Sequence, residues 1–109
     1  MPIGFSISIL NEKYALISFE CDDVFLPEEL KAISPPDVVR SGLANRGIIL
    51  AGRGPIWLYC FLTHYYHPTR FVATYDPRMQ GAVVVESHTK EYNVGDIISI
   101  DKSLITTGS

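Results

Sequence analysis

Residues 46–76 read RGIILAGRGPIWLYCFLTHYYHPTRFVATYD, which is the pattern of a strand, a helix and a second strand. GIILA is typical of a buried strand, and the GRG that follows it predicts a turn. Pro55 suits the first helical position, the helix is expected to run to about Tyr66, and Pro68 ends it. RFVATY then forms the next strand, which should be parallel to the first and joined to it by a right-handed crossover.

The helix of this unit is apolar around most of its surface. The face expected to pack on the sheet consists of Trp57, Leu58, Phe61, Leu62 and Tyr65. Ile56, Tyr59 and Cys60 make the remainder apolar too. Hydrophobic residues form 47% of the chain and the mean hydropathy is +0.16, which is high for a domain of 109 residues. We therefore expect a partner subunit to cover part of the helix in a homodimer.

The flanking segments add short strands. FSISIL and YALISFE predict an antiparallel hairpin over residues 5–20, and the prolines of residues 21–39 leave room for one helical turn, at Glu28–Ala32. GAVVVESH, residues 81–88, predicts a further strand, and NVGDIISI a turn into the last one. The tail 103–109 has no packing signal and is expected to fray.

These elements amount to about six short strands around one long helix. We predict a single domain over residues 1–109, an α+β fold of ferredoxin-like type with a mixed sheet and one main helix.

Charge limits the classes of partner. The chain has 12 acidic and 9 basic residues, a net charge of -3, so it lacks the global positive field that gathers long nucleic acid, and DNA is not an expected partner. An anionic ligand must therefore be held by a local site. The first residues, MPIGFSISILNEKY, do not follow the pattern of a secretory signal, and no run approaches the ~18 apolar residues of a membrane helix. We expect a cytoplasmic protein without a membrane partner.

One edge of the predicted sheet gathers groups suited to a phosphate. The carboxyl ends of parallel strands lie at the same edge, so Gly52 and Arg53 should neighbour Asp76 and Arg78. The GRGP turn, with Gly52 and Gly54, opens a helix whose N–H groups and dipole favour an anion, and both arginines add contacts to it. Two alternatives stay open: GRGP as a plain strand-to-helix turn, and YDPRMQG as a Pro-containing turn.

His67 is expected far from this edge. It precedes the strand whose other end carries Asp76, and the six intervening strand residues separate the two by roughly 20 Å. A single subunit cannot use both on one phosphate, whereas two subunits stacked edge to edge could. Alternatively, His67 only stabilises the C-terminus of the helix.

Further histidines raise the question of a metal. His64 and His67 are three residues apart, which suits a metal ligand pair, but no third ligand is adjacent. Glu86 and His88 share the parity of Val84, so they should lie on its face of the sheet. They are reserve candidates for metal ligands, or simply the polar end of a strand.

Four motifs carry a resemblance to a known family. GRGPIWLY, then HYYHPTRFVATYDPR, then GAVVV with a histidine soon after, and finally VGD resemble the CRISPR-associated Csx-three family over most of residues 50–96. The resemblance implies a dimeric, ferredoxin-like ring nuclease that linearises cyclic tetra-adenylate, the second messenger of type III CRISPR defence. It also implies a Mn²⁺-dependent removal of 3′-terminal adenylates from RNA, and dimers that stack with the ligand between them.

The resemblance assigns roles to particular residues. His67, Asp76 and Arg78 would be the catalytic group, with the GRGP turn on the ligand-binding surface. Asp76 would support Mn²⁺ or orient the attacking oxygen, while Arg78 and Arg53 neutralise the phosphate; His67 would act as acid, base or metal ligand. Two other functions remain open, namely a cyclic oligoadenylate or RNA sensor that does not cleave, and a purely structural dimer.

Overall fold

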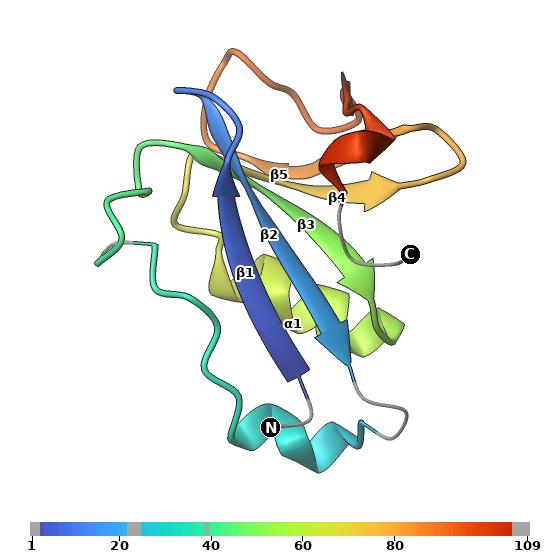
Figure 1. The fold of residues 1–109 in the computed structure, drawn as a ribbon. Coiled ribbons are helices and arrows are strands. Elements are labelled where there is room, and N and C mark those ends of the chain that lie inside the picture. Colours follow the sequence, from blue (N-terminus) through green and yellow to red (C-terminus); the bar gives the residue numbers. More distant parts are fainter. Residues whose placement is uncertain (1–2, 22–24, 39, 106–109) are drawn as a thin grey trace.

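The computed structural model describes residues 3–21, 25–38 and 40–105 (Figure 1). The strands are β1 (Ile3–Ile9), β2 (Tyr14–Cys21), β3 (Gly47–Arg53), β4 (Phe71–Asp76), β5 (Gly81–Ser87) and β6 (Ile97–Ser99). One α-helix, α1 (Ile56–Tyr65), is accompanied by two short 3₁₀ helices, η1 (Pro27–Lys31) and η2 (Lys102–Leu104). Among the described residues, no helix is long and apolar enough to cross a membrane.

All six strands form one mixed sheet in chain order, β1-β2-β3-β4-β5-β6. β1 and β2 form the predicted antiparallel hairpin, β2, β3 and β4 are parallel, and β5 and β6 return antiparallel. The parallel β3-α1-β4 unit and the mixed sheet with one main helix are therefore confirmed. The strand order differs from the ferredoxin-like prediction, because that arrangement splits its β-α-β units with an intervening strand, whereas β3 and β4 pair directly.

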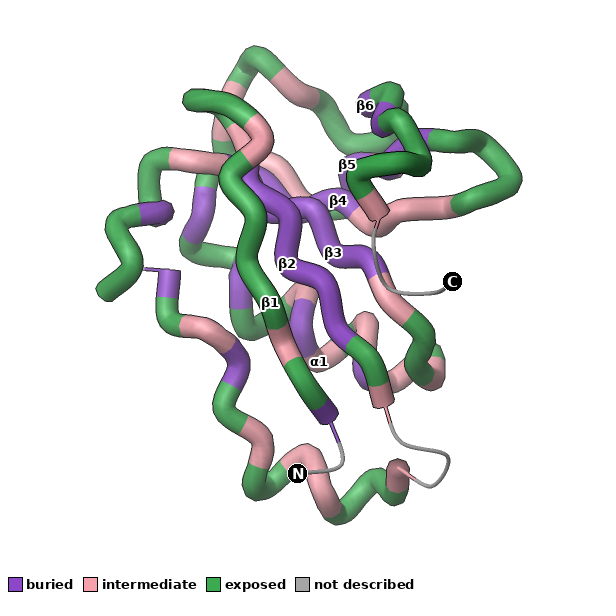
Figure 2. Tube along the Cα trace, viewed as in Figure 1, coloured by how far each residue is buried: buried purple, intermediate pink, exposed green. Residues whose placement is uncertain are grey.

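The sheet carries a hydrophobic core on each face, and its central strands are buried on both (Figure 2). The helix-side core joins α1 to alternate residues of the strands, including Ile17, Phe19, Ile48, Leu50 and Val72. The opposite core includes Leu16, Ile49, Phe71, Val84 and Ile98, and Ile105 packs against it after η2. Ile105 of the predicted tail therefore packs against the sheet, and the fraying of that tail stays a prediction. Residues 106–109 lie outside the described part of the chain.

Helix α1 contacts the sheet through fewer residues than its composition indicated. Leu58 and Leu62 are fully buried, each contributing about 1.5–3 kcal/mol of hydrophobic stabilisation. Tyr66, just beyond the helix, is also fully buried, and its hydroxyl donates to the Pro36 carbonyl oxygen at 2.7 Å. Tyr65, predicted on the buried face, is 40% exposed because Tyr66 takes the inward position. Burial raises the pKa of Tyr66, which keeps its hydroxyl protonated as a donor.

Candidate functional site

The parallel strands place the predicted phosphate-binding groups at one edge of the sheet. Arg53 is the last residue of β3 and Asp76 the last of β4, and both strands run in the same direction. Gly52 and Arg53 belong to β3, not to a turn as predicted, because they continue the ladder with β2 opposite Phe19 and Glu20. The Arg53 side chain makes no ion pair with any residue of the described part of the chain, and it lines a cleft of about 860 Å³.

Gly52 has a structural reason to be glycine. A Cβ atom there would lie 2.1 Å from the Phe19 carbonyl oxygen of the adjacent strand. The Gly52 N–H donates to the Tyr59 hydroxyl at 3.1 Å, and this hydroxyl donates to the Gly52 carbonyl oxygen at 2.6 Å. Gly54 is also closely packed, since its Cβ would lie 2.8 Å from a Leu58 methyl group. The Gly52 N–H is therefore already satisfied, and a ligand role for either glycine stays a prediction.

Asp76 and Arg78 form a closed pair in the turn after β4. The Arg78 guanidinium donates from Nε to Oδ1 at 3.2 Å and from Nη2 to Oδ2 at 3.0 Å, and the Arg78 N–H donates to Oδ1 at 2.9 Å. These hydrogen bonds lower the pKa of Asp76. The Asp76 side chain is 23% exposed and that of Arg78 is 86% exposed. Asp76 thus orients Arg78, whose Nη1 is left to contact an anion.

His67 lies at the other end of β4, as predicted. Its Nδ1 is 3.0 Å from the His64 carbonyl oxygen at the C-terminus of α1. A protonated Nδ1 donates to this carbonyl, and the ring then presents Nε2 as the atom for proton transfer or ligation. The His67 and His64 rings are stacked with centroids 5.5 Å apart. This hydrogen bond agrees with the open alternative of a helix-capping role and also fixes the ring's orientation.

A β-bulge in β5 changes the face of the sheet on which Glu86 lies. Val84 pairs with Ala73, but Glu86 pairs with Val72, so Val85 is the extra residue. The predicted common face with Val84 was therefore wrong, because each bulge residue reverses the alternation that follows it. Glu86 lies opposite Val72, which belongs to the helix-side core.

All three histidines of the chain meet beside this bulge. The His88 Nε2 lies 3.0 Å from a Glu86 carboxylate oxygen, and the His88 ring centroid is 6.2 Å from that of His67. The bulge could not be predicted from GAVVVESH, because the residues beside Val85 are Val84 and Glu86, and neither is the glycine or proline that often marks a bulge.

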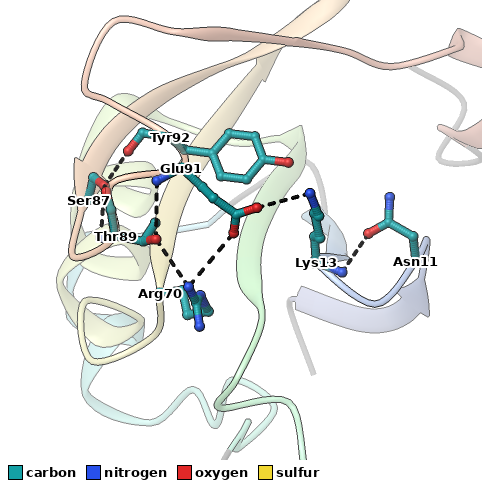
Figure 3. Close-up of polar contacts among 7 residues, drawn as sticks. All are labelled: Asn11, Lys13, Arg70, Ser87, Thr89, Glu91 and Tyr92. Atoms are coloured by element: carbon teal, nitrogen blue, oxygen red, sulfur yellow. Dashed lines mark hydrogen bonds and ion pairs between the residues drawn. The ribbon is translucent and has the colours of Figure 1, made fainter.

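Ionic contacts stabilise this edge of the sheet (Figure 3). The Glu91 carboxylate lies 2.9 Å from Lys13 Nζ and 3.8 Å from Arg70 Nη2, which links the β5–β6 connection to the start of β4 and to the first hairpin (Figure 3). Arg70 also donates to the Thr89 hydroxyl at 3.1 Å, and its carbonyl oxygen accepts from the His88 N–H at 2.8 Å. The bond to Lys13 lowers the pKa of Glu91. The backbone that carries His88 is thus tied directly to β4.

Comparison with known proteins then gives the family. A family model described as "CRISPR-associated protein (Cas_csx3)" matches residues 18–99. The chain belongs to this family. A protein of Aquifex aeolicus (strain VF5) is 50% identical over 96 residues, which cover 88% of this chain and 86% of that protein, and it is described only as "Uncharacterized protein". The Cas_csx3 match spans both ends of β4, and so includes His67, Asp76 and Arg78.

Manganese is the ion that the family resemblance implies, and the described residues of one copy do not fit it. The described residues contain no group of three or more His, Cys, Asp or Glu side chains that could hold a metal ion. Asp76 offers both oxygens to Arg78, and His67 lies at the opposite end of β4. The ligands predicted from the sequence are therefore not brought together within one copy.

Proposed function

We propose that this member of the Cas_csx3 family is a phosphodiesterase that linearises cyclic tetra-adenylate in type III CRISPR defence. The same site would trim 3′-terminal adenylates of RNA. The observation that carries the proposal is the division of the candidate catalytic group between the two ends of β4, within the region that matches the family. The proposal places the protein in the cytoplasm.

Two copies are needed to complete the site in this proposal. The Asp76–Arg78 pair of one copy would face His67 of another, with the cyclic ligand between them. Arg78 and Arg53 would neutralise the phosphate, and the Nε2 atom of His67 would exchange a proton with the attacking or leaving oxygen. Mn²⁺ enters the proposal only as an ion shared between copies, with Asp76 and His67 as its predicted ligands.

Exposed apolar side chains support assembly. Ile56, on the first turn of α1, is 82% exposed, and Cys60 and Tyr65 of the same helix are also exposed. Apolar surface of this kind favours a subunit contact. We propose a homodimer that stacks into higher oligomers when the ligand is bound.

The ion pair of Asp76 favours one alternative function. The Asp76 carboxylate is paired with the Arg78 guanidinium, and the described residues of a single copy contain no group of metal ligands. A sensor that binds a cyclic oligoadenylate or RNA without cleaving it would need the arginines but no metal. The experiment must therefore separate binding from cleavage.

Complementation between two inactive variants tests the shared site. His67→Ala and Asp76→Ala proteins are each incubated with cyclic tetra-adenylate and Mn²⁺, separately and mixed, and products are resolved by chromatography. We expect each variant alone to be inactive and the mixture to recover up to about a quarter of the wild-type rate, because some interfaces then contain one intact His67 and one intact Asp76.

The controls separate the possible outcomes. The double variant His67→Ala/Asp76→Ala mixed with either single variant supplies the same protein concentration without an intact site. Absence of recovery from folded, assembling variants would refute the shared site. An intact ring with wild-type protein, in Mn²⁺ and in EDTA, together with retention of the ring on the protein, would support the sensor.

A further inference from the structure

The cleft beside Arg53 extends well beyond the residues that the sequence indicated. It lies past the carboxyl ends of β3 and β4, and its other walls are the β4–β5 turn and the segment around η2. Its volume of about 860 Å³ is within the range of roughly 300–1,000 Å³ that is usual for small-molecule sites. The side chains that line it include those of Arg53, Tyr75, Gln80, Asp101 and Lys102.

Cations outnumber anions in this cleft. Arg53 and Lys102 both line it, and neither forms an ion pair with another residue in the part of the chain that the structure describes. Asp101, the acidic residue of the lining, caps η2, because its Oδ1 accepts from the Ser103 N–H at 2.9 Å. Arg53 belongs to β3 and Lys102 to η2, so the two cations come from different walls of the cleft, and a phosphate group in it could contact both.

Tyr75 supplies an aromatic surface. It is half-buried at the end of β4, where it packs against the core opposite the helix, and its hydroxyl makes no hydrogen bond with any described residue. The other tyrosine of the cleft, Tyr59, is held by Gly52 and packs edge-on against Phe19. The exposed part of Tyr75 is therefore the aromatic surface available for stacking on a nucleobase.

Gln80 occupies an unfavourable backbone position. Its φ is 48°, in the left-handed region that favours glycine, and it is the only residue other than glycine with positive φ among those described. The Gln80 amide makes no side-chain hydrogen bond to a described residue and lines the cleft. A strained residue with an unused polar group is typical of a ligand site.

We propose that this cleft binds one adenine nucleotide unit of the ligand. Arg53 and Lys102 contact its phosphate, Tyr75 stacks on the base, and the Gln80 amide bonds the adenine edge through N6 and N7, which is the pairing that a glutamine makes best. This inference rests on the proposed function and deepens it, because it assigns the base-recognition residues of the same site.

Binding without cleavage tests the inference directly. Affinities for cyclic tetra-adenylate, linear tetra-adenylate and linear tetra-uridylate are measured by calorimetry in EDTA, for the wild type and for Gln80→Gly, Lys102→Gln and Tyr75→Leu. The matched control is Lys31→Gln, because Lys31 is exposed on η1, well away from η2 in Figure 1. Melting temperatures are recorded for every variant.

Gln80→Gly gives the sharpest result. Glycine removes the strain at this position, so the melting temperature of the variant should stay unchanged or rise by roughly a few degrees. The affinity for both adenylates should nevertheless fall by about tenfold or more, and the preference over tetra-uridylate should be lost. Tyr75→Leu should weaken all three ligands by about tenfold, and Lys102→Gln should reduce the salt dependence of binding.

The outcomes distinguish this inference from the proposed function. Cleavage with unchanged affinities in Gln80→Gly and Lys102→Gln would overturn the inference and leave the phosphodiesterase standing. If the cleft variants bind the ring more weakly than the wild type does, and the ring stays intact in Mn²⁺, the inference is supported and the phosphodiesterase is overturned. A wild type that neither binds nor cleaves would overturn both. If Tyr75→Leu does not fold, the two surface variants decide the matter.

Discussion

Replacing Gly52 by alanine tests whether the GRGP glycine serves the fold or the ligand. The added Cβ would lie 2.1 Å from the Phe19 carbonyl oxygen and 2.8 Å from the Phe19 ring. The oxygen is main chain of the neighbouring strand and cannot rotate away, so β2 and β3 would have to separate. Overpacking of this kind costs about 3 kcal/mol or more, out of the roughly 5–15 kcal/mol that stabilises a typical domain.

Urea denaturation gives the measurement. With a slope of about 1.5 kcal/mol per molar urea, a loss of 3 kcal/mol lowers the midpoint by about 2 M. Gly4→Ala is the matched control, because Gly4 also lies in a strand and a Cβ there would have no atom within 4 Å. A Gly52→Ala midpoint equal to that of Gly4→Ala, combined with a loss of cyclic tetra-adenylate affinity, would refute the steric argument and make Gly52 a ligand residue.

Three further predictions concern single hydrogen-bonding groups. Tyr66→Phe leaves the Pro36 carbonyl oxygen without its donor and should cost about 1 kcal/mol, lowering the melting temperature by about 4 °C in a calorimetric scan. Tyr59→Phe removes two bonds to the main chain of β3 and should cost about 1–2 kcal/mol by urea denaturation, while cyclic tetra-adenylate affinity stays within about twofold. Arg78 lowers the pKa of Asp76 below its ordinary value of 3.8, so this pair stabilises the protein above that pH and its contribution is lost as pH falls through the lower folded-state value. The urea midpoints of wild type and Asp76→Asn should therefore differ at pH 6 and converge as the pH falls below the lowered pKa of Asp76; a constant difference would show that the carboxylate's charge is not involved.

The β-α-β unit could be predicted because its signals are local. Two prolines bracket the helix, and the strands on either side are short apolar runs, so only one arrangement of the three elements fits. That arrangement alone placed Arg53 and Asp76 at one edge and His67 at the other, as the structure shows. The helix surface was harder to predict, because an almost wholly apolar sequence does not reveal which side is buried. Tyr65 and Tyr66 are adjacent and chemically alike, and only packing distinguishes them.

Two features of the site lay outside what periodicity can reveal. The bulge at Val85 inserts one residue into a run of three valines, where every register has the same hydrophobicity, so the face of Glu86 could not be read. The wall of the cleft near η2 comes from a helix of three residues, which is too short for a periodic signal. A weak signal was present there, since Asp101 two residues before Ser103 is a typical capping pattern.

The length of β4 is the physical reason why the proposed site would depend on assembly. Six residues at about 3.3 Å each separate its ends by roughly 20 Å, which no pair of side chains can bridge. The bulge and the ionic contacts of Glu91 stabilise the His67 edge, while the Asp76–Arg78 pair and the cleft belong to the other edge. In the proposed complex these two different edges meet, which makes the contact heterologous, so each added copy exposes a new half-site at the end of the stack. Catalysis by such an arrangement should therefore rise faster than linearly with protein concentration, and excess His67→Ala/Asp76→Ala double variant should inhibit the wild type by occupying its edges without completing a site.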